Sequence, residues 1–253
     1  MTVKPDIVNR TVGKKYQQFI NSKLPSNQLP LIVDGECGRM TTAMTYLVFQ
    51  NKNASAITDA QYDEIATLLK EPNTTRIRTV AQVESAGSGW DKYGFPVILF
   101  ERHYFWQLTN GRVGITQFSN PARNTKYTID ADGDGINDSW EDVTASMFFD
   151  ASAAFQSFSM SKFQIMGKWY DKLGFNEPWE MAYEVSRGEY VHYKMMANWI
   201  LLNNRINSLK AISGDPKTCA AFAQFWNGGA YATHNYHGRL AAAYKSLAPK
   251  YGK

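Results

Sequence analysis

The sequence has 253 residues, of which 44% are hydrophobic, 14% aromatic and 20% charged. This composition can bury a hydrophobic core, so it excludes wholesale disorder, and the 18 glycines and 9 prolines follow no fibrous period. The longest apolar runs are far shorter than the roughly 20 residues that a membrane-spanning helix needs. For a chain of this length we expect one large domain and one small domain.

The formal net charge of +4 hides an uneven distribution. Residues 130 to 142 contain six of the 23 acidic residues and no basic residue, so the remainder of the chain is clearly basic. A basic body favours a polyanionic partner such as a nucleic acid, an anionic membrane surface or a bacterial wall. The net charge alone does not show which of these partners the protein binds.

Two features bear on the cellular compartment. The N-terminal residues alternate polar and apolar side chains and lack the order of a signal peptide, so we expect synthesis in the cytoplasm without classical export. Cys37 and Cys219 lie far apart in the sequence and show no metal-ligand spacing. We therefore predict buried thiols and not a disulfide framework.

The first 70 or so residues favour three short helices. Apolar residues at four-residue steps predict a helix that ends near Ser22, and a second apolar stripe lies between residues 43 and 50. The segment Thr58–Gln61 has the pattern of a capping box, which predicts the start of a third helix. The helical pattern breaks at residues 71–73, where we place a domain boundary.

A motif within this segment resembles a known module. Residues 33–43 read VDGECGRMTTA, and the stretch ends at Phe49-Gln50. It resembles the "DG…G…T…A…FQ" signature of the three-helix peptidoglycan-binding modules of wall hydrolases. The resemblance implies a peptidoglycan-binding-like helical domain over residues 1–71 and leaves residues 72–253 for a second domain.

Glu84 is the first candidate for chemistry. It follows Ile77, Val80 and Ala81 at helical spacing, so a helix from about residue 74 to 85 places its carboxylate in line with an apolar face. Burial raises the pKa of a carboxyl group, as a general acid near neutral pH requires. From spacing alone, a helix-terminal glutamate that reaches into water is an open alternative.

Four motifs and a tail follow one another in one order along the second domain: Val83–Trp90 (VESAGSGW), Pro96–His103 (PVILFERH), Phe163–Gly167 (FQIMG), Phe225–Gly229 (FWNGG) and Tyr236–Tyr244 (YHGRLAAAY). Together they resemble the N-acetylmuramidase domain of phage endolysins, which is related to goose-type lysozymes and lytic transglycosylases. The resemblance implies a mostly α-helical fold, with a lysozyme-like catalytic domain beside the small three-helix N-terminal domain.

The resemblance also implies roles for individual residues. Glu84 matches the catalytic glutamate, Gln164 the glutamine on the floor of the cleft, and Asn227 and Tyr231 the segment that lines the cleft. The chain departs from the family pattern at two places. Residues 159–162 read SMSK where Ser-Trp-Gly-Leu is expected, and Phe225-Trp226 stands where a tyrosine usually precedes the asparagine.

Glu101 is a second carboxylate with two open interpretations. It follows an apolar run and adjoins Arg102 and His103, so it can be a buried, ion-paired structural residue or a second catalytic group. The resemblance implies a mechanism with a single glutamate and inversion, in which Glu84 protonates the glycosidic oxygen.

An acidic loop at residues 130–141 fits the twelve-residue formula of a calcium loop. Carboxylates and one backbone carbonyl occupy the ligand positions, and a glycine occupies the turn; the ligands are Asp130, Asp132, Asp134, Ile136, Asp138 and Glu141. No flanking helices are obvious, so the loop looks more like those of extracellular repeats than like an EF-hand. We expect a structural Ca²⁺; the alternative is a solvated acidic turn.

These observations lead to one functional hypothesis with alternatives. The resemblance implies an endolysin that cleaves the β-1,4 bond between N-acetylmuramic acid and N-acetylglucosamine. We expect a monomer that binds peptidoglycan strands in the periplasm, without nucleic acid or stable membrane insertion. A lytic transglycosylase, a non-catalytic wall-binding protein and a secretion-system effector remain alternatives.

Overall fold

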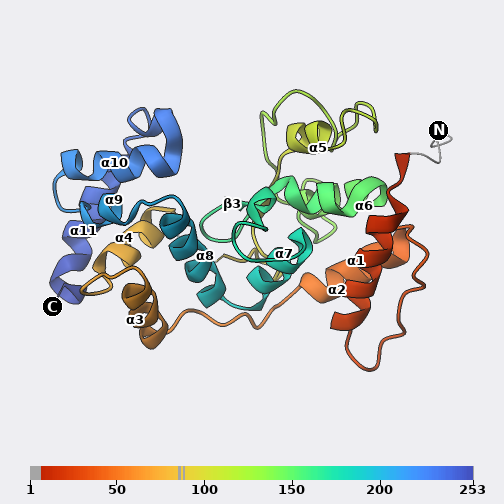
Figure 1. Ribbon diagram of the computed structural model, residues 1–253, viewed down its shortest axis with the longest axis horizontal. Coiled ribbons are helices and arrows are strands. Elements are labelled where there is room, and N and C mark those ends of the chain that lie inside the picture. Colours follow the sequence, from red (N-terminus) through yellow and green to blue (C-terminus); the bar gives the residue numbers. More distant parts are fainter. Residues whose placement is uncertain (1–6, 85–86, 88, 253) are drawn as a thin grey trace. The chain divides into compact units, whose positions relative to one another are not determined.

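The computed structural model describes residues 7–84, 87 and 89–252 (Figure 1). The chain forms two compact units: the described residues up to Ala54 together with Trp90–Arg187, and the described residues of Ser55–Gly89 together with Gly188–Lys253. Helices predominate in both, which confirms the predicted mostly α-helical class. Among the helices described, none is long and apolar enough to cross a membrane.

The first unit surrounds a small sheet with helices (Figure 1). Its elements are α1 (Arg10–Lys23), α2 (Arg39–Phe49), β1 (Ile98–Phe100), α5 (Arg102–Leu108), α6 (Asp138–Gln156), β2 (Phe158–Met160), β3 (Ile165–Met166), the 3-10 helix η2 (Gly167–Trp169) and α7 (Pro178–Arg187). The strands are antiparallel in the order β1-β2-β3, with Leu99 opposite Ser159 and Met160 opposite Ile165.

The core of the first unit is aromatic. Tyr16 on α1 and Phe49 on α2 are fully buried, and their rings lie 5.2 and 5.5 Å from the ring of Phe155 on α6. The ring of Tyr16 also lies 5.3 Å from that of Trp179 on α7. Burial of such rings is a large hydrophobic contribution to stability. Helices α1 and α2 therefore share one core with α6 and α7.

The chain does not divide at residue 71 as the sequence suggested. Helices α1 and α2 belong to the first unit, whereas the third predicted helix, α3 (Asp59–Leu68), belongs to the second. The physical reason is that Phe49, part of the expected module signature, is buried against α6 and not within a separate three-helix core. A wall-binding role for residues 1–71 stays a prediction.

The second unit carries the predicted catalytic glutamate. Besides α3 it contains α4 (Thr75–Glu84), α8 (Glu189–Leu202), α9 (Ile206–Lys210), α10 (Pro216–Asn227), the 3-10 helix η3 (Gly228–Tyr231) and α11 (Tyr236–Tyr251). The capping box is confirmed, since the Gln61 amide donates to Thr58 Oγ1 at 3.2 Å and the Thr58 amide to Gln61 Oε1 at 3.0 Å. Helix α11 packs against both α4 and α10.

Both cysteines are free, buried thiols, as predicted. Cys37 lies in the first unit and Cys219 in the second. Burial raises the pKa of the Cys37 thiol to about 12, so this side chain stays protonated and unreactive at neutral pH.

Candidate active site

Glu84 ends α4, as the spacing of apolar residues predicted. The Ser85, Ala86 and Ser88 positions of the glycine-rich segment lie outside the described residues. The Glu84 carboxylate accepts hydrogen bonds from the hydroxyl of Tyr236 on α11 and from the side chain of Trp226 on α10. Three helices of the second unit therefore fix the position of one carboxylate.

Burial raises the pKa of Glu84 above that of an ordinary glutamate. The hydrogen bonds from Tyr236 and Trp226 and the positive charge of Arg239 favour the ionised form, but their combined effect is smaller than that of burial. Glu84 thus keeps its proton to a higher pH than an exposed glutamate does. The interpretation as a glutamate that extends into water does not hold.

The backbone next to Glu84 is anchored by a charged side chain. Nη2 of Arg239 on α11 donates to the carbonyl oxygen of Val83 at 2.6 Å, although the Arg239 residue is itself exposed. This bond satisfies a carbonyl near the end of α4 and brings a cation close to the carboxylate. A positive charge at this distance stabilises the carboxylate that remains after proton donation.

Asn227 and Tyr231 lie in the same unit as Glu84, at the end of α10 and in η3. Asn227 is exposed and adjoins Trp226 in the chain, whereas Tyr231 is half-buried with its ring 5.5 Å from that of His237. Within the described part of the chain, neither residue hydrogen-bonds to Glu84. Their predicted contact with substrate stays a prediction.

Gln164 lies in the first unit, in the turn between β2 and β3. Its Oε1 accepts a hydrogen bond from Ser159 Oγ at 2.7 Å, and its Nε2 donates to the Ser161 carbonyl at 2.8 Å. Both Ser161 and Gln164 have left-handed backbones, with φ of 76° and 50°. Non-glycine residues adopt this conformation at a cost, which is typical of functional sites.

Several residues of the site were missed by sequence reasoning. Ser159 and Ser161, which hold Gln164, lie in the segment that departs from the family pattern, and Trp226 lies in the other departure. Tyr236 opens the tail motif. Nothing in the local sequence links Tyr236 to Glu84. The sequence could have indicated these residues only through their positions inside the motifs.

Glu101 occupies the N-terminal cap of α5, but its carboxylate does not cap the helix. Instead, Tyr127 donates its hydroxyl to Oε1 at 2.7 Å, and His103 Nδ1 lies 3.2 Å from Oε2. The neighbouring Arg102 donates to the carbonyls of Ala122 and Arg123 at 3.1 and 3.0 Å. Glu101 is therefore associated with a tyrosine and a histidine and is not paired with the adjacent arginine.

Burial lowers the pKa of His103 by more than the neighbouring Glu101 raises it. The imidazole is therefore mainly neutral near pH 7. Burial and the contact with Glu101 raise the pKa of Tyr127, so its hydroxyl stays protonated and remains a donor. The surroundings of Glu101 thus supply one hydrogen bond, from Tyr127, and a nearby imidazole, rather than a full opposite charge.

The acidic loop lies in the first unit, and its carboxylates converge. One oxygen each of Asp130, Asp132 and Asp134 lies within 4.8 Å of the others. Burial, followed by the charges of Asp134 and Asp132, raises the pKa of Glu141. Asp138 accepts hydrogen bonds from the Ala131 amide at 2.9 Å and from the Thr128 hydroxyl, so its oxygens already have protein donors.

The predicted absence of flanking helices is wrong on the C-terminal side of the loop, whereas the described residues 109–137 before α6 form no helix. Helix α6 begins at Asp138, inside the twelve-residue loop, and Asn137 caps it by accepting a hydrogen bond from the Ser139 amide at 2.9 Å. Residues 130–138 are polar and turn-forming, so the sequence did not indicate where this helix starts. Asn, Asp and Ser are common both in loops and at helix N-caps.

Comparisons with known proteins agree with this architecture. The sequence model of the family described as N-acetylmuramidase matches residues 73–248, which is most of the chain. The solved crystal structure of an endolysin from the Burkholderia AP3 phage superposes with a TM-score of 0.65 and 23% identity, covering 95% of this chain and 86% of that chain. No curated protein matches the chain. The shared fold is mostly α-helical and lysozyme-like, and the chain belongs to the N-acetylmuramidase family.

Proposed function

We propose that this glycoside hydrolase cleaves the β-1,4 bond between N-acetylmuramic acid and N-acetylglucosamine in peptidoglycan, with Glu84 as the general acid. The surroundings of Glu84 carry the proposal. Burial raises the pKa of its carboxyl, and the two donors Tyr236 and Trp226 stabilise the carboxylate formed when the proton leaves. A general acid must hold its proton before the reaction and release it during the reaction. Burial favours the first state, and the two hydrogen-bond donors favour the second.

The proton goes from the Glu84 carboxyl to the glycosidic oxygen as the bond to the anomeric carbon breaks. Water then supplies a hydroxyl group to that carbon and a proton that restores Glu84. In an inverting glycosidase a second polar group orients the water. Within the first unit, hydrogen bonds from Tyr127 and Ser159 fix the side chains of Glu101 and Gln164, the other site residues that the sequence predicts.

A lytic transglycosylase would use the same acid but let a hydroxyl of the sugar close an anhydro ring. Digestion of purified sacculi in ¹⁸O-labelled water, followed by mass spectrometry of the muropeptides, separates the two reactions. We expect reducing ends that carry one ¹⁸O atom. Anhydro products without the label would contradict hydrolysis, and no released product would favour a wall-binding protein.

The likeness to a phage endolysin supports a role in host lysis. We propose that the enzyme reaches the periplasm through a pore made by a second phage protein and acts as a monomer. Coexpression with a holin should lyse a bacterial culture, and the Glu84→Gln variant should not. Protection by a cognate immunity protein, without need of a holin, would instead favour a secretion-system effector.

We also propose that the acidic loop holds a structural Ca²⁺. The donor set fits, because clustered carboxylate oxygens are the ligands that this hard cation prefers, and Asp130 Oδ1 is buried without a hydrogen-bond partner in the described structure. Asp130, Asp132, Asp134, Asp138, Glu141 and the Ile136 carbonyl would hold the ion. Asp138 also begins α6. A calcium ion bound there would therefore order both the loop and the start of the helix.

A further inference from the structure

Two large apolar side chains of the first unit are almost fully exposed. Leu29 and Ile32 are 87% and 82% exposed, the highest values among the large hydrophobic residues described. Both lie in the segment between α1 and α2, and we call residues 24–33 the apolar loop (Figure 1). The loop reads LPSNQLPLIV and includes no charged side chain. Contiguous exposed apolar surface marks sites that contact proteins or membranes.

The apolar loop is anchored to α1 in this exposed position. The Leu31 amide donates to Asn21 Oδ1 at 2.7 Å, and Asn21 Nδ2 donates to the Leu31 carbonyl at 2.9 Å. Leu31 is itself buried, so the exposed Leu29 and Ile32 lie close to an anchored residue. Because the backbone is already fixed there, little conformational entropy is lost when these two side chains bind a partner.

A second anchor follows the apolar loop. Gln17 Nε2 donates to Asp34 Oδ1 at 2.9 Å, and the Gly35 amide donates to Gln17 Oε1 at 2.7 Å. Gly35 has a φ of 87°, and a Cβ there would clash with the backbone of Arg10, so the chain passes close against α1. Asn21 and Gln17 are four residues apart and lie on one face of the helix. One face of α1 therefore holds the loop and the residues after it.

Helix α1 adds positive charge to this region. Between residues 7 and 33 the sequence has no acidic residue and four basic ones, which are Arg10, Lys14, Lys15 and Lys23. Arg10 and Lys15 pair with Glu36 and Glu177. Lys14 and Lys23 take part in none of the ion pairs among the described residues. The region therefore combines exposed apolar side chains with uncompensated positive charge.

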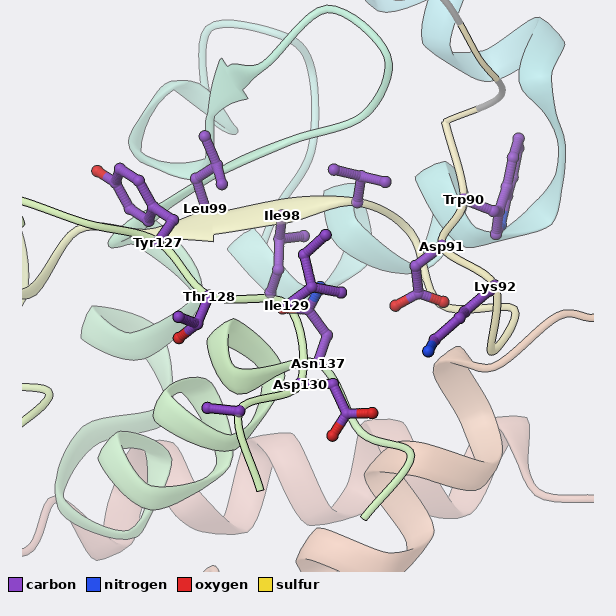
Figure 2. A pocket seen from close by; sticks show the side chains of 12 residues that line it. Trp90, Asp91, Lys92, Ile98, Leu99, Tyr127, Thr128, Ile129, Asp130 and Asn137 are labelled. Carbon is purple, nitrogen blue, oxygen red and sulfur yellow. The ribbon is translucent and has the colours of Figure 1, made fainter. Parts of the chain in front are cut away.

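Another exposed apolar side chain of the first unit has different surroundings. Ile129 is 63% exposed and lines a pocket of about 770 Å³ with Asp91, Asp130 and a single lysine, Lys92 (Figure 2). The neighbouring acidic loop adds further negative charge, so an anionic surface is repelled from Ile129. Ile129 is therefore a matched control for the apolar loop.

We infer that the apolar loop docks the protein on the surface of a membrane rich in anionic phospholipids. Leu29 and Ile32 enter the boundary between headgroups and acyl chains, where apolar side chains leave water. Lys14 and Lys23 face the anionic headgroups. The contact is peripheral, because only side chains of one loop enter the lipid. It does not involve Glu84, so it goes beyond the proposed hydrolysis.

The size of the surface favours a membrane over a protein partner. Specific protein interfaces bury about 800 Å² on each partner and involve about 20 to 30 residues on each side. The apolar loop is much shorter than this, and its two exposed side chains supply only a small part of such an area. A bilayer, in contrast, accepts single apolar side chains without a complementary pocket.

Sedimentation of the full chain with lipid vesicles tests the inference at a fixed calcium concentration. Wild type should bind vesicles of equal parts phosphatidylcholine and phosphatidylglycerol, and high salt should weaken the binding. The double variant Leu29→Ser/Ile32→Ser should bind about tenfold more weakly, because binding scales with the apolar area buried. Lys14→Gln should bind about fivefold more weakly. Ile129→Ser is the control and should bind like wild type.

Three results of the vesicle experiment would overturn the inference. They are no binding of wild type to the anionic vesicles, equal binding to phosphatidylcholine alone, and undiminished binding of the double variant. Loss of sacculus binding by the double variant, without vesicle binding by wild type, would assign the loop to the wall and also overturn it. Glu84→Gln should bind vesicles like wild type, so failure of the proposed hydrolysis is seen separately, as full activity of that variant.

A fluorescent label tests whether the apolar loop itself enters the lipid. Both native thiols are buried, so an environment-sensitive dye can be attached selectively to Leu29→Cys or, as the control, to Ile129→Cys. Anionic vesicles should shift the emission of the first dye to the blue and leave that of the second unchanged. No shift of the first dye, or an equal shift of both, would overturn the inference.

Discussion

Two carboxylates of this chain, Glu84 and Glu101, have contrasting surroundings. Glu84 receives hydrogen bonds from Tyr236 and Trp226, and burial raises its pKa. Glu101 lies at the start of α5 with 22% of its side chain exposed, beside His103 and the hydroxyl of Tyr127. The same functional group therefore has two environments in one chain.

This difference supports the proposal that the two side chains have different roles. A buried carboxyl that retains its proton is suited to donate it, whereas a partly exposed carboxylate held by hydrogen-bond donors is suited to orient water or substrate. Burial, rather than the presence of a partner, distinguishes them, because each carboxylate accepts a bond from a tyrosine.

The largest effect should come from removal of the acidic proton. Glu84→Gln keeps the shape of the side chain but has no proton to transfer, so the rate of sacculus clearance should fall by about 10² to 10⁴. Glu101→Gln is the matched control, and it should lose less activity if Glu101 only positions water. Activity of Glu84→Gln within tenfold of wild type would contradict the assignment, and an equal loss in a folded Glu101→Gln protein would make Glu101 catalytic.

Calcium should act on the unit that contains Glu101. An ion bound only by the folded loop stabilises the protein by about 2.7 kcal/mol at a hundredfold excess over its Kd. A chelator should therefore lower the Tm of wild type, and Mg²⁺ should restore it poorly because it requires a tighter octahedral shell. Calorimetry that shows no calcium heat for wild type, or the same affinity for Asp132→Ala, would mean that the loop is a solvated turn.

Stability should depend on pH through Glu84. Because its folded-state pKa is raised, the stability that its proton contributes is complete below the pKa of the unfolded chain and is lost as the pH rises through the folded-state value. Glu84→Gln lacks this loss. The Tm of the variant relative to wild type should therefore increase between about pH 4 and pH 8. A difference that stays constant or decreases with pH would show that burial does not destabilise the ionised form.

The smallest effect concerns the donors to Glu84. Tyr236→Phe removes a hydrogen bond to the carboxylate, so the pKa of Glu84 should rise further and the basic limb of the pH–rate profile should move to higher pH. Tyr127→Phe removes a similar bond from Glu101 and should leave that limb unchanged. Equal movement in both variants would indicate that the limb does not report on Glu84 alone.

Local patterns in the sequence predicted local structure well. The spacing of Ile77, Val80 and Ala81 predicted the helix that ends at Glu84, and the capping box predicted the start of α3. These features depend on residues only a few positions apart, so a short segment of sequence is enough to predict them.

Features that depend on distant residues were not predictable in this way. Tyr236 is 152 positions from Glu84, and an apolar stripe does not reveal which helix will cover it. For the same reason Tyr16 and Phe49 indicated helices but not their burial against Phe155. The family model begins at residue 73, beside the predicted boundary, but the compact units of the structure do not divide there. Burial of a carboxylate is a property of the whole packing arrangement, not of the segment that contains it.

The most direct test of the central claim is a titration of Glu84 itself. In protein labelled with ¹³C at the glutamate carboxyls, the Glu84 resonance can be assigned by its absence from Glu84→Gln and followed as a function of pH. The structure predicts a midpoint above the ordinary glutamate value of about 4.3. A midpoint at or below that value would contradict the assignment of Glu84 as the proton donor.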